Sequence, residues 1–288
     1  MERADMANST LKKIFKYTAF GSSLAAASAM TTPALSSGMD AAGKADPANH
    51  VKDDQAPSTP NVIFIVLDDM GFSDLGCYGS EIKTPSIDRL AANGLRYNNF
   101  CTTPVSSPTR ASLLTGRQNN SVGMGNVADV SLGPDRPNMQ GRISPSAGTI
   151  AEILSGEGFG TFGAGKWHAV PGYQMTPAGP FENWPLGKGF DRYYGFLCGE
   201  TDQYHPQLIY DNHAVTPPDD PDYHLSEDLL RHATQFVTDQ VSIYPEKPFF
   251  MYFALGAPHS PFQVPQTYID MYEGVYEKGW NALRGLKN

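Results

Sequence analysis

The stretch Asn61-Val-Ile-Phe-Ile-Val-Leu67-Asp68-Asp69 decides the fold class of this protein. Its apolar, largely β-branched run has the length of a strand, and it lacks polar alternation, which is typical of a central strand buried on both faces of a parallel sheet. Two adjacent carboxylates follow at the end of the strand, where they are costly unless a cation or hydrogen bonds compensate them. We therefore expect a buried strand that delivers Asp68 and Asp69 to a polar site.

Strand and helix patterns alternate along the rest of the chain. Further strands are expected at 95–100, 160–165 and 247–255. Helices are expected between a Thr84 cap and a Gly94 stop, over 108–114, and from a capping box that opens at Thr149. A last helix carries one apolar stripe, formed by Leu225, Leu229, Leu230, Ala233, Phe236, Val237 and Val241. This alternation predicts an α/β fold with a mainly parallel central sheet flanked by helices and with functional side chains at strand ends.

The composition excludes several classes of protein. The 288 residues are 40% hydrophobic, which excludes disorder over most of the chain. The net charge of −9 and the lack of long basic runs argue against binding to nucleic acid or stable association with membranes. An anionic substrate would need local positive charge or a metal ion. Cys77, Cys101 and Cys198 are too few for a disulfide framework, and we expect ordinary buried thiols with at most one bridge.

The N-terminal 58 residues divide into two segments. Residues 1–29 have a basic start, a short apolar middle and the small-residue site Ala27-Ser28-Ala29, a pattern that predicts a secretory signal peptide. An N-terminal anchor or a disordered tail is the alternative. Residues 30–58 are expected to be a flexible linker, and the folded domain then occupies 59–288. A periplasmic or secreted location follows from the signal peptide.

Further polar side chains follow the other expected strands. Ser106 precedes a helix, where backbone N–H groups favour an anion, and Arg110 lies one turn farther on. Lys166 and His168 follow the strand that ends at 165, and His259 follows the strand that ends at 255. Each feature alone is weak evidence. Four strand ends that all supply chemically active groups indicate an enzyme.

Four of these segments resemble one known family. Leu67-Asp-Asp-Met-Gly71, the Ser106–Arg117 segment, Gly165-Lys-Trp-His168 and Ala257-Pro-His259 are similar in kind and order to the motifs of type I sulfatases, within the alkaline-phosphatase-like superfamily. The segments 190–196, 200–203 and 279–284 resemble its bacterial arylsulfatase branch. The resemblance implies hydrolysis of sulfate esters, with aryl sulfates as the expected class, and an alkaline-phosphatase-like sandwich.

The resemblance also implies a modified nucleophile and a metal ion. Ser106 occupies the position that the family oxidises to formylglycine, and a serine there implies a radical-SAM maturase that acts before export. Cys101 lies outside the motif. Asp68, Asp69 and the oxygens at position 106 would bind calcium, which prefers oxygen ligands.

The remaining roles implied by the resemblance concern binding and proton transfer. Arg110 would steady the modified side chain, and Lys166 would bind a sulfate oxygen. His168 would take a proton from the nucleophile after the sulfuryl transfer. His259 would bind the ester oxygen and help to protonate the leaving alcohol.

Family members continue beyond position 288 to an Asp-Asn pair that completes the calcium site and to a second active-site lysine. Asp211-Asn212 is the right dipeptide, but it precedes His259 and lies in a loop-like stretch, so we do not assign it to the metal. We therefore expect an incomplete N-terminal part of the catalytic domain, with its C-terminal part missing, exposed sheet edges and weak calcium binding.

Two alternative functions remain open. One is hydrolysis of phosphate monoesters, phosphate diesters or phosphonates, with a modified or unmodified Ser106. The other is a secreted sulfatase-like binding protein without catalysis. Trp184, Tyr193 and Tyr204 are candidates for an aryl pocket, although core packing is the commoner position for such side chains.

Overall fold

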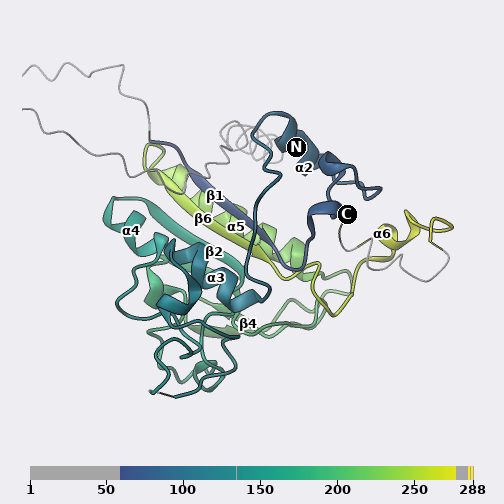
Figure 1. Cartoon of the computed structure of the whole chain (residues 1–288). Coiled ribbons are helices and arrows are strands. Elements are labelled where there is room, and N and C mark those ends of the chain that lie inside the picture. The colour runs from purple at the N-terminus through teal and green to yellow at the C-terminus, as the bar shows by residue number, and fades with distance from the viewer. Residues whose placement is uncertain (1–58, 134, 277–284, 286, 288) are drawn as a thin grey trace, which may run out of the picture.

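A mainly parallel sheet forms the centre of the protein (Figure 1). The computed structural model describes residues 59–133, 135–276, 285 and 287. Within them, six strands follow the order β1-β6-β2-β3-β4-β5. The strands are β1 (Val62–Leu67), β2 (Gly160–Lys166), β3 (Arg192–Phe196), β4 (Leu208–Tyr210), β5 (His213–Val215) and β6 (Phe249–Leu255). The first four strands of this order are parallel, and β4 and β5 form an antiparallel hairpin at one edge.

Helices cover both faces of this sheet, as expected for an α/β fold (Figure 1). The helix α5 packs on one face, and α3 and α4 pack on the other. The α-helices are α2 (Pro85–Ala92), α3 (Ser106–Thr115), α4 (Ile150–Gly156), α5 (Leu225–Ile243) and α6 (Gln266–Asp270). Short 3-10 helices span Phe72–Asp74, Gly76–Tyr78, Asn119–Val122, Gly172–Gln174 and Leu186–Lys188. No helix among the described residues is long and apolar enough to cross a membrane.

The strand β6 shows why the sheet forms a core on each face. Because side chains alternate along a strand, Phe250 and Tyr252 pack with α3 and α4, whereas Phe249 and Met251 pack with α5. All four side chains are buried. No charged residue interrupts β6. The strand pairs in parallel with both β1 and β2. The strand β6 is therefore an interior strand of the sheet, next to the edge strand β1.

The expectation that 61–67 forms a central strand is wrong. The strand exists as β1, but it pairs only with β6 and lies at the edge of the sheet within the described residues. Its side chains are mostly half-buried, and Ile65 is 40% exposed. A run of apolar residues shows that a strand can be buried, but it does not fix how many other strands pair with that strand, because this depends on the rest of the fold.

Two other expectations are also corrected. Residues 95–100 form no strand, because no other strand pairs with them, and Leu95 and Phe100 lie on the surface. Leu230 is 54% exposed, so it does not belong to the buried stripe of α5. The antiparallel pair β4 and β5 was not expected, since each has only three residues.

The local signals of the helices are confirmed in most cases. Thr149 Oγ1 accepts a hydrogen bond from Glu152 N at 3.1 Å, and Glu152 accepts one from Thr149 N, which completes the expected capping box of α4. The expected helix over 108–114 is α3, which already begins at Ser106 and ends before Gly116. The expected signal peptide (1–29), the linker (30–58) and the 279–284 motif lie outside the described residues.

Candidate active site

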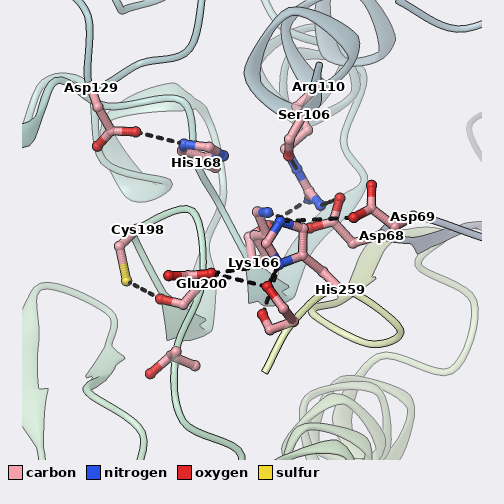
Figure 2. A network of polar contacts seen from close by, with 12 residues as sticks. Asp68, Asp69, Ser106, Arg110, Asp129, Lys166, His168, Cys198, Glu200 and His259 are labelled. Carbon is pink, nitrogen blue, oxygen red and sulfur yellow. Dashed lines mark hydrogen bonds and ion pairs between the residues drawn. The ribbon is translucent and has the colours of Figure 1, made fainter. Parts of the chain in front are cut away.

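The parallel register brings the carboxyl ends of four strands to one edge of the sheet. Leu67 of β1 lies opposite Leu255 of β6, and Lys166 of β2 lies opposite Phe196 of β3. The backbone N–H of Asp68 donates to the carbonyl of Ala257 at 3.2 Å, which joins the first and last of these ends. The segments that follow the strands therefore meet at one place, as predicted from the positions of the polar residues (Figure 2).

A buried ionic network lies at the centre of this place (Figure 2). Lys166 Nζ donates to Asp68 Oδ2, and the Arg110 guanidinium lies 3.5 Å from Asp68 Oδ1. Arg110 is 2% exposed and Lys166 is 1% exposed. Arg110 also donates to the Lys166 carbonyl at 3.0 Å and to the Tyr252 hydroxyl at 2.9 Å. These three ionic side chains carry one more positive than negative charge, in surroundings that exclude water.

Ser106 lies beside this network. It is the first residue of α3, and its hydroxyl accepts a hydrogen bond from Arg110 Nε at 2.9 Å. The two residues are four positions apart, so the helix places them on the same face. The neighbouring Ser107 points into the protein, where its hydroxyl accepts a bond from Ala128 N at 3.0 Å. Ser106 is therefore the serine that faces the cationic groups.

Burial affects the protonation of Lys166. Loss of contact with water lowers the pKa of the ammonium group, and the nearby Arg110 charge lowers it further. Asp68 raises the pKa in opposition, through its charge and its hydrogen bond. The net direction is downward. The carboxylate of Asp68 is therefore what favours a charged Lys166 in this buried position.

His168 is paired with a carboxylate from a separate loop. Its Nε2 lies 3.0 Å from Asp129 Oδ2, while Nδ1 is buried and has no hydrogen-bond partner. Burial lowers the pKa of the ring, and the positive charges of Lys166 and Arg110 act in the same direction. The Asp129 carboxylate raises this pKa, but the net direction is downward. The imidazole is thus favoured in its neutral form, which can accept a proton.

His259 lies at the more exposed side of the site, near Asp69 and Glu200. Its Nδ1 is 2.7 Å from the Ser260 carbonyl, and a carbonyl can only accept, so Nδ1 carries the proton. The Asp69 and Glu200 carboxylates each lie 3.9 Å from a ring nitrogen, beyond hydrogen-bond distance. The Asp69 backbone has a φ of 63°, a conformation that is sparsely populated for a non-glycine residue.

The described residues do not form a complete calcium site. Asp68 and Asp69 are suitable oxygen ligands, but calcium takes about six to eight oxygens. The Asp68 carboxylate is paired with Lys166 and Arg110. Among residues 59–133 and 135–276, no group of three or more carboxylate, histidine or cysteine side chains converges on one point. Asp211 lies in the turn between β4 and β5 and binds Arg192 and the Tyr193 backbone.

The structure thus brings together Asp68, Ser106, Arg110 and Lys166, with His168 beside them and the Asp69–His259 pair at the exposed side. Sequence reasoning missed Asp129, which no motif marks, and Tyr252, whose hydroxyl is hidden in an apolar strand. Glu200 lies in the 200–203 segment that resembles the bacterial arylsulfatase branch, but its position in the sequence indicates no role. Trp184 and Tyr193 are core residues with 0% and 1% exposure, so they do not line an aryl pocket.

The three cysteines are free thiols, but the expectation that all of them are buried is wrong. Cys101 is exposed, and Cys77 and Cys198 are half-buried. The loops that carry Cys77 and Cys101 lie outside the two core clusters, so those thiols do not contribute to the packing of the sheet.

Comparisons with known proteins agree with this arrangement. The sulfatase family model matches residues 60–287. An arylsulfatase of Klebsiella aerogenes is 33% identical over 237 residues, which cover 77% of this chain and 47% of that protein. Human arylsulfatase A is 42% identical over 139 residues, covering 47% of this chain and 25% of that protein. The chain spans less than half the length of these relatives.

A solved structure shows the same fold. The crystal structure of Ps i-CgsB in complex with k-i-k-neocarrahexaose superposes with a TM-score of 0.63 at 28% identity, covering 79% of this chain and 51% of that one. Together with the family model, which matches well over half of the residues, this likeness shows that the chain belongs to the sulfatase family, within the alkaline-phosphatase-like superfamily.

Proposed function

We propose that the protein hydrolyses sulfate esters and that the reaction takes place at Ser106. The observation that carries this proposal is the contact of Ser106 with Arg110 inside a buried cluster of net positive charge, in a chain of the sulfatase family. Excess positive charge in a water-poor site stabilises a bound anion and the charge that develops on it during transfer. A sulfate group fits these requirements.

The residues around position 106 would bind and orient the substrate. Arg110 donates to the oxygen at 106 and holds it in place, and Lys166 would donate to a sulfate oxygen once substrate arrives. We propose that Ser106 is converted to formylglycine by a radical-SAM maturase before export through the 1–29 signal peptide to the periplasm or the exterior. The hydrated aldehyde would supply a hydroxyl nucleophile and a second hydroxyl whose proton can be removed.

Two histidines would move protons on opposite sides of the site. His168 has a buried, unpartnered Nδ1 that can accept a proton from the oxygen at 106. His259 is half-exposed and lies on the Asp69 side, so it would contact the ester oxygen of the leaving alcohol. A phenol leaves readily with little protonation, and aryl sulfates are therefore the first substrate class that we propose to test.

We propose Ca²⁺ as the metal ion, with Asp68 and Asp69 as two of its ligands. Both are oxygen donors, which suits a hard cation. Binding would require Asp68 to exchange its contact with Lys166 for the ion, and further oxygens would have to come from outside the described residues. The residue roles above do not depend on the ion.

The mass of the tryptic peptide Tyr97–Arg110 tests the nucleophile. Coexpression with a radical-SAM maturase should remove two hydrogens from this peptide, and expression without the maturase should leave Ser106 unchanged. Hydrolysis of p-nitrophenyl sulfate should then appear only with the modified protein. Ser106→Ala should abolish it, whereas Ser155→Ala, on the exposed side of α4, should not change it.

The same preparations separate the alternative functions. An unmodified Ser106 that still hydrolyses p-nitrophenyl phosphate would support the phosphoesterase reading and contradict ours. Binding of sulfate esters without turnover by the modified protein would support the non-catalytic reading. A sulfated oligosaccharide should be assayed beside the aryl ester, because the solved Ps i-CgsB structure holds k-i-k-neocarrahexaose.

A further inference from the structure

His168 is held both at its backbone and at one edge of its ring. Its backbone N–H donates to the Leu197 carbonyl at 3.1 Å, and the residue has a φ of 46°, in the left-handed region. Gly199 packs against the edge of the ring, where a Cβ atom would lie 2.9 Å from His168 Cε1. The ring is therefore confined on the side of the segment that follows β3, and which of its nitrogens carries the proton depends on its polar contacts.

Asp129 is positioned to make that choice. Its carboxylate is acceptor-only when ionised, so the 3.0 Å contact with Nε2 requires the proton on Nε2. This leaves Nδ1 unprotonated in the neutral ring. In Figure 2, Nδ1 lies on the side of the ring away from Asp129, toward the group formed by Ser106 and Lys166. Nδ1 is also buried without a partner, which is costly unless a donor arrives during function.

The loop that carries Asp129 is tied to the helix that carries Ser106. The backbone N–H of Ala128 donates to the Ser107 hydroxyl at 3.0 Å, so the residue before Asp129 is bound to the residue after Ser106. Ala128 is completely buried, whereas the Asp129 side chain is 53% exposed. The anchored backbone fixes where the Asp129 side chain begins, and its contact with Nε2 sets the direction of the carboxylate.

We propose that Asp129 is a positioning residue for His168, which it holds with the proton on Nε2 so that Nδ1 is the base facing position 106. The inference rests on the proposed function and adds to it a residue that does not touch the substrate. In the step itself, an O–H bond at position 106 breaks, its electron pair stays on oxygen, and the proton forms an N–H bond with Nδ1. The Asp129 carboxylate takes up no proton in this step, and its charge compensates the imidazolium that results.

The other charged groups around the ring make this compensation necessary. The Lys166 and Arg110 charges disfavour an imidazolium, and so does burial. Asp129 is the acidic side chain that opposes them at this ring. Without it, the ring would be a weaker base and would have no fixed tautomer, since an asparagine amide can donate to Nε2 as well as accept from it.

Nuclear magnetic resonance of the ring nitrogens tests the proposal on the chain itself. Long-range ¹H–¹⁵N spectra of the wild type should show His168 as the Nε2–H tautomer. Asp129→Asn should give a mixed tautomer and a lower His168 pKa, Asp129→Glu should restore the tautomer in part, and the exposed Asp219→Asn should change neither. A wild-type ring with its proton on Nδ1, or an unchanged ring in Asp129→Asn, would overturn the proposal.

Kinetics of the maturase-treated protein supply the second readout. Asp129→Asn should lower kcat about 10- to 100-fold, the range found when the partner that orients a metal-bound histidine is removed. The change in KM should be smaller, and the acid limb of the kcat–pH profile should move to lower pH together with the His168 pKa. An altered tautomer with an unchanged kcat would also refute the positioning role. If even the wild type hydrolyses no sulfate ester, the proposed function fails, while the spectra still decide the tautomer.

Discussion

Removal of the Tyr252 hydroxyl isolates one contact of the buried network. Tyr252 lies on the interior strand β6 and accepts a hydrogen bond from Arg110 Nη1 at 2.9 Å. The change Tyr252→Phe keeps the ring and its packing against Phe190. It leaves one guanidinium N–H of Arg110 without a partner in a place that water does not reach, because both side chains are almost completely buried.

The expected magnitude follows from the charge of the donor. A hydrogen bond to a charged group contributes about 1.5–3 kcal/mol, and the loss of one partner leaves the other unsatisfied. Each kcal/mol shifts Tm by about 2–4 °C in a domain of about 150–250 residues. Tyr252→Phe should therefore lower the free energy of unfolding by about 1.5–3 kcal/mol and Tm by about 3–12 °C.

Urea unfolding and thermal scans measure this effect. The control Tyr244→Phe removes a hydroxyl at an exposed position and should change stability by less than about 0.5 kcal/mol. In a double-mutant cycle with Arg110→Met, the two changes should show a coupling above about 0.5 kcal/mol. A Tyr252→Phe protein as stable as the wild type, or a coupling near zero, would refute the reading of Arg110 as the centre of the network.

Three further predictions concern the same edge of the sheet. Asp68→Asn removes the carboxylate partner of the buried Lys166 and should lower the free energy of unfolding by about 3–5 kcal/mol in urea. Gly165→Ala should cost about 4 kcal/mol or more and leave little folded protein by circular dichroism, because φ is +109° and a Cβ would lie 1.8 Å from the Ala254 carbonyl oxygen. The pKa of His168 is lowered in the folded state, so the unfolded chain binds a proton first as pH falls. Stability should then be fully present above pH 6.5 and decline below it, and His168→Gln should weaken this decline in urea titrations.

A control or a contradicting result can be stated for each of these three predictions. Asp219→Asn removes the same charge from an exposed position and should leave the free energy of unfolding unchanged. If Asp219→Asn and Asp68→Asn lower it equally, the Asp68–Lys166 ion pair does not explain the loss. Gly79→Ala has a similar positive φ of 95° but open space around the Cβ, and it should cost only about 1 kcal/mol. If Gly79→Ala and Gly165→Ala cost the same, strain in the backbone and not the close approach of β6 would explain both. A His168→Gln protein with the wild-type pH dependence would show that other groups cause the acid-side loss.

Some features of the fold are local and could be predicted from residues close together in the chain. The capping box at Thr149 depends on a few neighbouring atoms, and it is present. The strands β2 and β6 were predicted because runs of strand length in apolar and small residues have few other stable arrangements. The same rule failed at 95–100, where the pattern is similar but no neighbouring strand completes the hydrogen bonds.

In the candidate site, too, residues that lie in local motifs were predicted, whereas residues that reach the site only through the tertiary structure were not. Asp68, Ser106 and Lys166 were predicted because each ends a strand or begins a helix within a recognisable motif. Their contact with one another was expected from the parallel sheet, whose strands all end at one edge. Asp129 and Tyr252 were not predicted, since one lies in a loop without a motif and the other in an apolar run.

The amino-acid sequence by itself therefore determined the α/β class, the presence of the main helices and the chemical groups at the strand ends, because these depend on hydrophobic period and on neighbouring residues. Only the tertiary structure decided that β1 lies at an edge of the described sheet, that Asp68 is paired with Lys166 and that Asp129 holds His168. Each of these depends on segments that are distant in the chain, and their approach is set by the packing of the whole domain.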